Sequence, residues 1–324
     1  MINKKYFIIT IDTEGDNLWT YRLGNTITTE NARYIPRFQD LCNRFNFKPV
    51  YLTNYEMAQD NYFVAFAQEA LAKNICEIGL HIHAWNTPPY YELKSGYIDY
   101  GLPYLIEYPS SVMREKIDTM INLLRSKFNT DIISHRSGRW ATNQDYFDML
   151  IDYGLKIDCS LTPHISWKSV RGYSSESKGS DYRTSSENPF MIKSSTANIS
   201  ILEVPVTIRT MHRLHFQKNI FHIRSCFNDI RDFACGKPIW IRPNGGNLSE
   251  ICALINQVKN SDSDYLMFML HSSELMPGGS PAFKNARAIE NLYRDIEIIF
   301  TLISENIEGI ILKNYYNKTK KEHD

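Results

Sequence analysis

Two acids stand where an apolar stretch of the chain ends, in a pattern that could bind a cation or move a proton. Asp12 and Glu14 follow the apolar run 6–11. Because alternate residues of an extended segment point to the same side, both carboxylates would face one way. They could share a cation, or divide into one base and one metal ligand. The alternatives are a helix cap and a solvated loop.

Two histidines follow a second apolar run with the same spacing. His81 and His83 lie at the end of the segment 77–83, so their imidazoles would also share one face. Paired imidazole nitrogens are common ligands of zinc and similar divalent ions. A single histidine in such a place would more often belong to the core or a loop. The pair, followed by Trp85 and a turn with two prolines, favours metal binding.

Three further groups of polar residues also follow apolar runs. His271 ends the run 265–270 and could act as a general acid near neutral pH, although a lone histidine can be structural. Arg136 and Arg139 could hold a catalytic carboxylate by a bidentate bond, or could be surface charges. Asp158 is the remaining acid in a predicted strand and a natural partner for one of these groups.

The elements that must position these residues alternate between strand and helix. Short apolar runs predict strands, and helical spacing of apolar residues predicts the segments between them. Repeated βα units indicate a parallel sheet, open or closed into a barrel, whose ligands bind at the carboxyl ends of the strands. The predicted strands are 6–11, 49–53, 77–83, 132–136, 156–161, 202–206 and 265–270, and the predicted helices are 29–45, 61–73, 112–128, 142–153 and 286–303.

The rest of the chain adds no second core. Residues 162–198 are polar and predict a long excursion with little regular structure, which is typical of lids and binding loops. The charged tail from about residue 315 is expected to be frayed. The sequence has no internal repeat, so residues 1–324 are predicted to form a single domain.

Composition excludes several kinds of protein. Lys and Arg total 36, as do Asp and Glu, so no overall charge favours nucleic acid or an anionic membrane. No apolar run approaches the about 18 residues of a membrane span, and no secretory signal precedes the first strand, so a soluble, cytoplasmic protein is expected. The six cysteines form no C-x-x-C pair, and phosphate-binding, dinucleotide-binding and serine-hydrolase motifs are absent.

Taken in order, these segments resemble the five motifs of the polysaccharide deacetylase family with the NodB homology domain. Segment 9–14 looks like the first motif, a strand ending in a base and a metal ligand. Segment 77–83 looks like the second, which delivers histidine ligands. Segments 136–140, 157–160 and 270–271 are similar to the third, fourth and fifth motifs, which carry an arginine, an acid and a catalytic histidine. The resemblance implies a distorted (β/α) barrel of about seven parallel strands.

The sequence departs from that family at two positions that concern the metal. Family members commonly have adjacent aspartates in the first motif, whereas here Thr13 takes the second place and Glu14 follows. They commonly space the two histidines four residues apart, whereas Trp85 stands at that position and His83 comes earlier. These departures imply either a site rebuilt around H-x-H or a site of weaker metal affinity.

The resemblance implies a metal-dependent deacetylase that acts on an N- or O-acetylated sugar of a polysaccharide or its precursor. The expected cofactor is a divalent ion, zinc first, with cobalt and nickel as alternatives; the expected partner is the acetylated sugar, and the oligomeric state stays open. The alternatives are a hydrolase of a non-sugar amide C–N bond and an inactive glycan-binding or regulatory barrel. The predicted catalytic residues are Asp12, His271, Arg136, Arg139 and Asp158, the metal ligands are Glu14, His81 and His83, and the substrate-binding residues are Trp85, Tyr90, Trp140 and Glu274.

Overall fold

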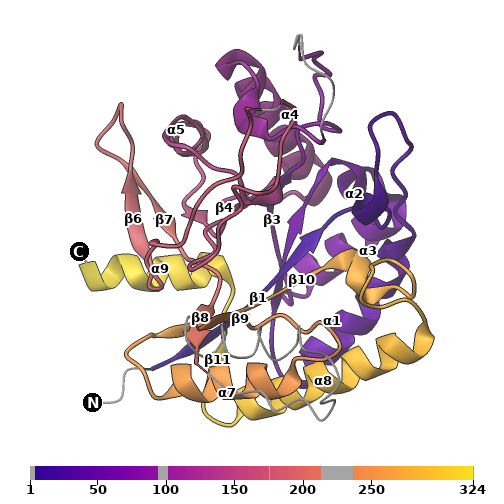
Figure 1. Ribbon diagram of the computed structural model, residues 1–324, viewed down its shortest axis with the longest axis vertical. Coiled ribbons are helices and arrows are strands. Elements are labelled where there is room, and N and C mark those ends of the chain that lie inside the picture. The colour runs from indigo at the N-terminus through magenta and orange to yellow at the C-terminus, as the bar shows by residue number, and fades with distance from the viewer. Residues whose placement is uncertain (1–3, 94–100, 175, 213–235, 324) are drawn as a thin grey trace, which may run out of the picture.

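A curled, mostly parallel sheet forms the centre of the molecule (Figure 1). The computed structural model describes residues 4–93, 101–174, 176–212 and 236–323. The sheet has the order β10-β1-β2-β3-β4-β5-β7-β6, with β11 paired to β1, and β8 and β9 form a separate antiparallel pair. The strands are β1 (Tyr6–Thr13), β2 (Pro49–Thr53), β3 (Glu77–Ile82), β4 (Ser134–Ser137), β5 (Ile157–Asp158), β6 (Phe190–Lys193), β7 (Ser200–Glu203), β8 (Ile208–Met211), β9 (Lys237–Trp240), β10 (Tyr265–His271) and β11 (Glu308–Gly309).

Strand register places the candidate catalytic residues at one edge of the sheet. Strands β1 and β10 are apolar and almost wholly buried, as strands covered on both faces must be. They pair in parallel with Asp12 opposite His271, and β3 pairs with β4 so that His81 lies opposite Arg136. Because all four strands run in the same direction, these side chains gather at the carboxyl edge.

On the edge of β10 that does not pair with β1, individual hydrogen bonds between described residues take the place of strand pairing. The Met267 amide donates to Thr207 Oγ1 over 2.8 Å, and the Met269 amide donates to the Ile241 carbonyl over 3.2 Å. The Tyr265 hydroxyl donates to the Pro205 carbonyl over 2.5 Å. In the described part of the chain, seven strands from β10 to β7 run parallel, so the predicted distorted (β/α) barrel is confirmed.

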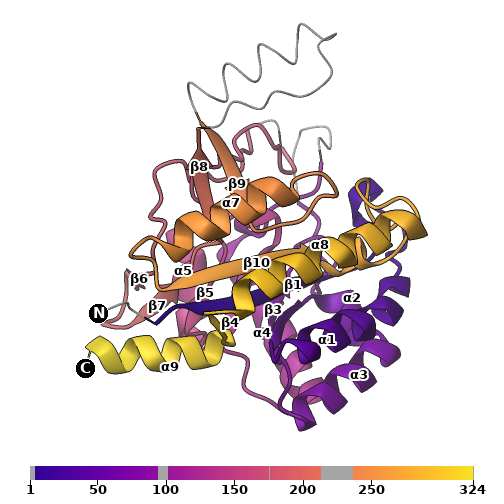
Figure 2. The same cartoon turned by 90° about the horizontal axis from the view of Figure 1, so that it is seen from below.

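Helices lie on the outside of the curled sheet, and α8 runs alongside β10 and β1 (Figure 2). Short polar side chains cap the N-termini of several helices. Asp60 Oδ1, for example, accepts from the Phe63 amide over 2.8 Å at the start of α3. None of the described helices has the length and apolarity that crossing a membrane requires. The helices are α1 (Ile35–Arg44), α2 (Tyr55–Gln59), α3 (Asn61–Ala72), α4 (Ser110–Phe128), α5 (Gln144–Asp152), α7 (Leu248–Lys259), α8 (Ala286–Ser304) and α9 (Leu312–His323), with 3₁₀ turns η1 (Leu18–Thr20), η2 (Glu30–Tyr34), η3 (Leu105–Glu107), η4 (Gly138–Trp140) and η5 (Ser272–Leu275).

Two segments are more ordered than the sequence predicts. The excursion 162–198 contains β6, which pairs antiparallel with β7 at the edge of the sheet. The tail from about 315 is not frayed in the described residues, because it belongs to α9. Tyr315 is buried there, and its hydroxyl donates to the Asp264 carboxylate over 2.9 Å. Leu312 is fully buried as well, so two side chains anchor a helix whose other residues are mostly polar.

Candidate active site

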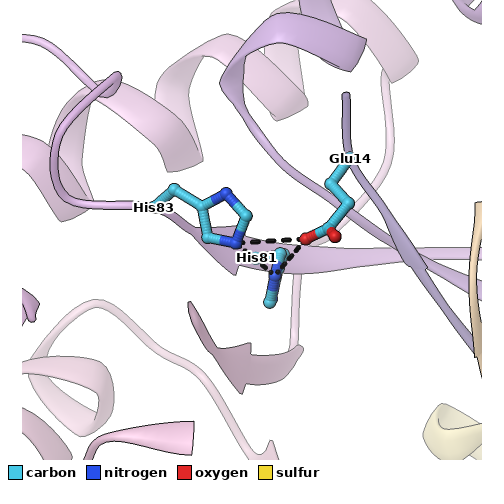
Figure 3. A group of neighbouring side chains, drawn as sticks. All are labelled: Glu14, His81 and His83. Carbon is cyan, nitrogen blue, oxygen red and sulfur yellow. Dashed lines mark hydrogen bonds and ion pairs between the residues drawn. The ribbon is translucent and has the colours of Figure 1, made fainter. Parts of the chain in front are cut away.

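Three side chains from two strand ends converge on one point, as Figure 3 shows. Glu14 follows β1, and His81 and His83 lie in and just after β3. Glu14 Oε2 lies 3.1 Å from His83 Nε2 and 3.4 Å from His81 Nε2, and the two Nε2 atoms are 3.1 Å apart. All three residues are buried. Each can offer one ligand atom, and these atoms lie within 4.8 Å of one another.

The chemistry of these donors fits a divalent cation. His81 Nδ1 lies 2.8 Å from the Arg136 carbonyl, which can only accept, so Nδ1 carries the proton in the neutral ring and Nε2 carries a lone pair. That lone pair then faces a carboxylate oxygen and a second imidazole nitrogen. Three acceptors at such distances repel unless a proton or a cation lies between them. Two imidazoles and a carboxylate are a common ligand set of zinc.

Hydrogen bonds to its main chain hold Glu14 in place. Its amide donates to Ser272 Oγ over 3.0 Å, and its carbonyl accepts from Asn31 Nδ2 over 2.7 Å. Asn31 Nδ2 also donates to Ser272 Oγ over 2.8 Å. Burial alone would raise the pKa of the Glu14 carboxyl, but His271, His83 and His81, when they carry a proton toward it, outweigh burial and hold this pKa well below its usual value. The site therefore favours an ionised carboxylate.

Asp12 is held by Arg136, which crosses from β4 to β1. Arg136 Nη1 donates to Asp12 Oδ1 over 2.6 Å, while its other nitrogens donate to Thr10 Oγ1 and to the Cys159 carbonyl, each over 2.9 Å. Burial would raise the pKa of Asp12, but the guanidinium charge lowers it below its usual value. Asp12 is thus an ionised carboxylate with one oxygen paired and the other facing His271.

Arg139 does not take the role that the sequence suggests for it. It donates to the Leu102 and Arg171 carbonyls, and its guanidinium lies 4.3 Å from the centre of the Tyr104 ring. Its backbone is left-handed, with φ of 56°, which turns the side chain away from Asp12. Arg139 nevertheless lines the cavity over Glu14, His81 and His83. Arg136, and not Arg139, orients the proposed base.

His271 lies opposite Asp12 and is held from behind. Its Nε2 is 3.8 Å from Asp12 Oδ2 and 3.9 Å from Glu14 Oε1. On the other side of the ring, Nδ1 lies 3.1 Å from Glu274 Oε2 and 3.0 Å from Arg242 Nη2. Burial would raise the pKa of Glu274, but Arg242 and His271 lower it to about 2. Nδ1 thus lies between a carboxylate, which can only accept, and a guanidinium, which can only donate, and these two contacts hold the ring with Nε2 facing the cavity.

A cavity of about 420 Å³ opens over these groups. Eight of the predicted residues line it: Asp12, Glu14, His81, His83, Trp85, Arg139, Trp140 and His271. Trp85 stacks on His83, with ring centres 4.5 Å apart, so one of its faces is already covered. Tyr90 lies outside this cavity and is 72% exposed. Glu274 touches His271 from behind, which makes it a positioning group and not a wall of this cavity.

Asp158 lies away from the cavity, in a buried network beneath it. Its Oδ1 is 2.5 Å from His135 Nδ1 and accepts from Ser160 Oγ over 2.8 Å. His135 Nε2 in turn lies 2.8 Å from the Tyr146 hydroxyl. The predicted catalytic role of Asp158 does not fit this placement, because strand register directs its carboxylate to His135, the residue next to it on β4. Glu274 instead provides the carboxylate partner of His271.

Some residues that build the site were not expected from the sequence. Arg242 follows β9, whose short apolar run 239–241 was a weak signal beside a glycine-rich turn. Asn31 and Ser272 act through polar contacts that no spacing reveals. Gly138 allows the turn η4, which follows β4, to pass close to the site: a Cβ there would collide with the Ile82 carbonyl and would lie 2.6 Å from His83 Cδ2.

Comparison with known proteins shows a likeness in fold. No family model and no curated protein matches the sequence. Among solved structures, a predicted glycoside hydrolase or deacetylase from Parabacteroides distasonis superposes with a TM-score of 0.62 at 9% identity, over 99% of this chain and 72% of that one. A predicted polysaccharide deacetylase from Mycobacterium smegmatis gives 0.55 at 12% identity, over 100% of this chain and 93% of that one.

A further match extends the likeness to a second kind of sugar-active enzyme. The 4-α-glucanotransferase from Thermococcus litoralis gives a TM-score of 0.55 at 14% identity, over 98% of this chain and 40% of that one. Identities this low speak for the architecture and not for the reaction. Together with the strand order, these likenesses establish that the chain has the distorted (β/α)-barrel fold of the NodB-like polysaccharide deacetylases.

Proposed function

We propose that this protein is a metal-dependent deacetylase that hydrolyses the acetyl group of an N- or O-acetylated sugar. One observation carries the proposal: three side chains that can bind a metal together lie beside a carboxylate held by an arginine and a histidine held by a carboxylate. Asp12 and His271 face each other across 3.8 Å beside Glu14, His81 and His83. Hydrolysis of an amide or ester needs a base, an acid and an electrophile in this mutual arrangement.

The metal would be held by Glu14, His81 and His83. Zinc fits the two nitrogen donors and one oxygen donor best, and cobalt and nickel accept the same donors. When bound, such an ion supplies Lewis acidity, which lowers the pKa of water and polarises a carbonyl. The bond from His81 Nδ1 to the Arg136 carbonyl fixes the ring and its tautomer, as second partners of metal-binding histidines commonly do.

The acid and base roles follow from the partners of each group. Asp12, kept ionised by Arg136, can take a proton from water, because its Oδ2 faces the cavity side of His271. His271 can give a proton from Nε2 to the departing amine or alkoxide, since Glu274 holds the ring through Nδ1. Water adds to the acetyl carbon, the bond to nitrogen or oxygen breaks, and acetate and a free amine or alcohol leave.

Release of acetate tests this proposal. Purified protein stripped of metal is incubated with acetylated sugars and with zinc, cobalt or nickel, and acetate is measured. The proposal expects acetate release that requires metal and is lost in His81→Ala. A panel of small non-sugar amides separates the alternative amide hydrolase, which would prefer them. An inactive barrel would release acetate from none of these substrates.

A further inference from the structure

A larger cavity adjoins the one over Glu14, His81 and His83, and nothing in the proposed reaction uses it. Its volume is about 710 Å³, within the usual range of ligand pockets. We call it the outer cavity. Trp85 lines both cavities, and its ring stacks on Tyr21 with centres 6.4 Å apart. The outer cavity is lined by Tyr21, Gly24, Asn25, Ile27, Thr29, Tyr55, Glu56, Gln59, Asp60, Asn61, Trp85, Asn86 and Tyr90.

The lining combines aromatic rings with side-chain amides. Tyr21, Tyr55 and Tyr90 join Trp85 around the space, and Tyr90 is 72% exposed. An aromatic ring is an apolar surface on which the C–H face of a sugar can lie, while amides and hydroxyls bond its oxygens. The composition therefore fits a sugar unit.

The described residues that line the outer cavity carry negative charge and no positive charge. Glu56 and Asp60 are the charged residues among the described residues that line it, and Lys, Arg and His are absent from that set. Glu56 accepts from the Gly15 amide over 3.0 Å and from the Asn54 and Asn86 side chains. These neutral donors fix the carboxylate without cancelling its charge, so the cavity keeps a negative potential.

Asp60 adds a second fixed carboxylate. Its Oδ1 caps α3 through the Phe63 amide, and its Oδ2 accepts from Thr29 Oγ1 over 2.8 Å. Its position is thus set by the fold, as is that of Glu56. Two fixed carboxylates among aromatic rings attract an ammonium group, which rings also bind through their faces. An anionic sugar would be repelled.

We propose that the outer cavity is a second sugar subsite, which takes a hexosamine unit with a free ammonium group beside the acetylated unit at Glu14, His81 and His83. This inference rests on the proposed deacetylase function and narrows it to partly deacetylated, N-acetylated glycans. Hydrolysis of the N-acetyl group adds water across the C–N bond and leaves acetate and an ammonium group. A unit already processed therefore carries the charge that Glu56 and Asp60 favour.

Binding tests the subsite without depending on turnover. A glucosamine trimer and an N-acetylglucosamine trimer of the same linkage are titrated against zinc-loaded His271→Ala protein, which lacks the proposed acid and so leaves both trimers intact. The fluorescence of the five tryptophans, of which Trp85 lines the outer cavity, is recorded. The expected preference is roughly three- to tenfold for the glucosamine trimer, as two partly solvated charge pairs would give. Glu56→Gln and Asp60→Asn should each reduce this preference, and Tyr90→Ala should weaken binding of both trimers.

Controls separate the subsite from a general charge effect and from misfolding. Glu30→Gln removes the same charge from η2, outside the outer cavity, and should keep the preference. Thermal unfolding checks each variant, and Asp60→Asn keeps an oxygen that can cap α3. Equal affinity for both trimers, or a preference that survives both cavity variants, overturns the inference. So does equally tight binding of spermidine, which would mark a site for cations and not for sugars.

A second readout distinguishes this inference from the function on which it rests. Acetate release is compared between a disaccharide with one free amine and its fully acetylated form. Faster release from the first, lost in Glu56→Gln, supports the inference. Amine-selective binding without any acetate release would overturn the proposed function, and acetate release without amine selectivity would overturn the subsite alone.

Discussion

Arg136 Nη1 donates to Asp12 Oδ1 over 2.6 Å, and both side chains are shielded from solvent. The pair joins β4 to β1 across the inside of the barrel and fixes the carboxylate that we propose as the base. A buried ion pair of this kind contributes little net stability, but removing one partner leaves an uncompensated charge. Its value here lies in holding Asp12 ionised and in one orientation.

The first prediction tests this pair. Arg136→Met should lower the free energy of unfolding by about 3 kcal/mol, because it leaves the Asp12 carboxylate buried without its cation. Adding Asp12→Asn to Arg136→Met should restore part of this loss, since no charge is then buried. Urea unfolding of the two single variants and the double variant measures the coupling. Strictly additive losses would contradict a direct pair.

The second prediction concerns the tight passage of the backbone at Gly138. A methyl group there would meet His83 and the Ile82 carbonyl, so Gly138→Ala should displace the ligand ring. We expect zinc affinity to fall at least about tenfold, as when a supporting contact of a ligand is lost. Gly246→Ala is the matched control, because its Cβ would meet only Asn244 Oδ1, at 3.9 Å. Equal zinc affinity in both variants would argue against His83 as a ligand.

The third prediction concerns Glu274 as the positioning residue of His271. Glu274→Gln should lower kcat by at least about tenfold and change KM little, since the proposed acid loses orientation while the substrate walls remain. Glu274→Asp should recover part of kcat. Glu250→Gln is the control, because that carboxylate lines the same cavity as Glu274 but pairs with Lys237, at 2.9 Å. A change confined to KM would place Glu274 in substrate binding instead.

The fourth prediction follows from the buried carboxyl of Glu203, which lies opposite Asp158 in the β5–β7 register. Burial and the Asp158 charge raise the pKa of Glu203 well above its usual value. The folded protein thus keeps a proton that the unfolded chain releases above about pH 4.5. Stability from this group is complete below that pH and is lost as pH rises toward the folded pKa.

Glu203→Gln tests that sign. Between pH 5 and 8 the free energy of unfolding should fall less in the variant than in the wild type. The two slopes should differ by up to about 1.4 kcal/mol per pH unit. Unfolding in urea at several pH values measures it. Parallel pH profiles of the two proteins would contradict a protonated Glu203.

The sequence predicts the strands that carry the site better than the partners inside it. The runs ending at Asp12, His81 and His271 are long, apolar and bounded by polar residues, so their edge positions follow from periodicity. Which of Arg136 and Arg139 reaches Asp12 depends on a left-handed turn after β4 that spacing does not reveal. The contact of Asp158 with His135 likewise depends on the register of β5 with β4, which spacing does not reveal.

The tail from about residue 315 shows that sequence alone can also predict too little order. Its charged residues predict fraying, yet Tyr315 packs against the rings of Tyr6 and Tyr265 and the segment is helical. Such a tertiary contact overrides a local preference and is invisible to composition. The single-domain organisation, the cytoplasmic location and the identity of the metal stay predictions.

Titration of metal into the stripped enzyme tests the central claim most directly. Zinc is added stepwise to wild-type protein and to Glu14→Ala with an N-acetylated sugar present, and acetate release is recorded against the zinc-to-protein ratio. We predict that wild-type activity rises from zero and saturates near one equivalent, while Glu14→Ala stays inactive at that ratio. Acetate release that is independent of zinc, or equal in the two proteins, would contradict the proposed site.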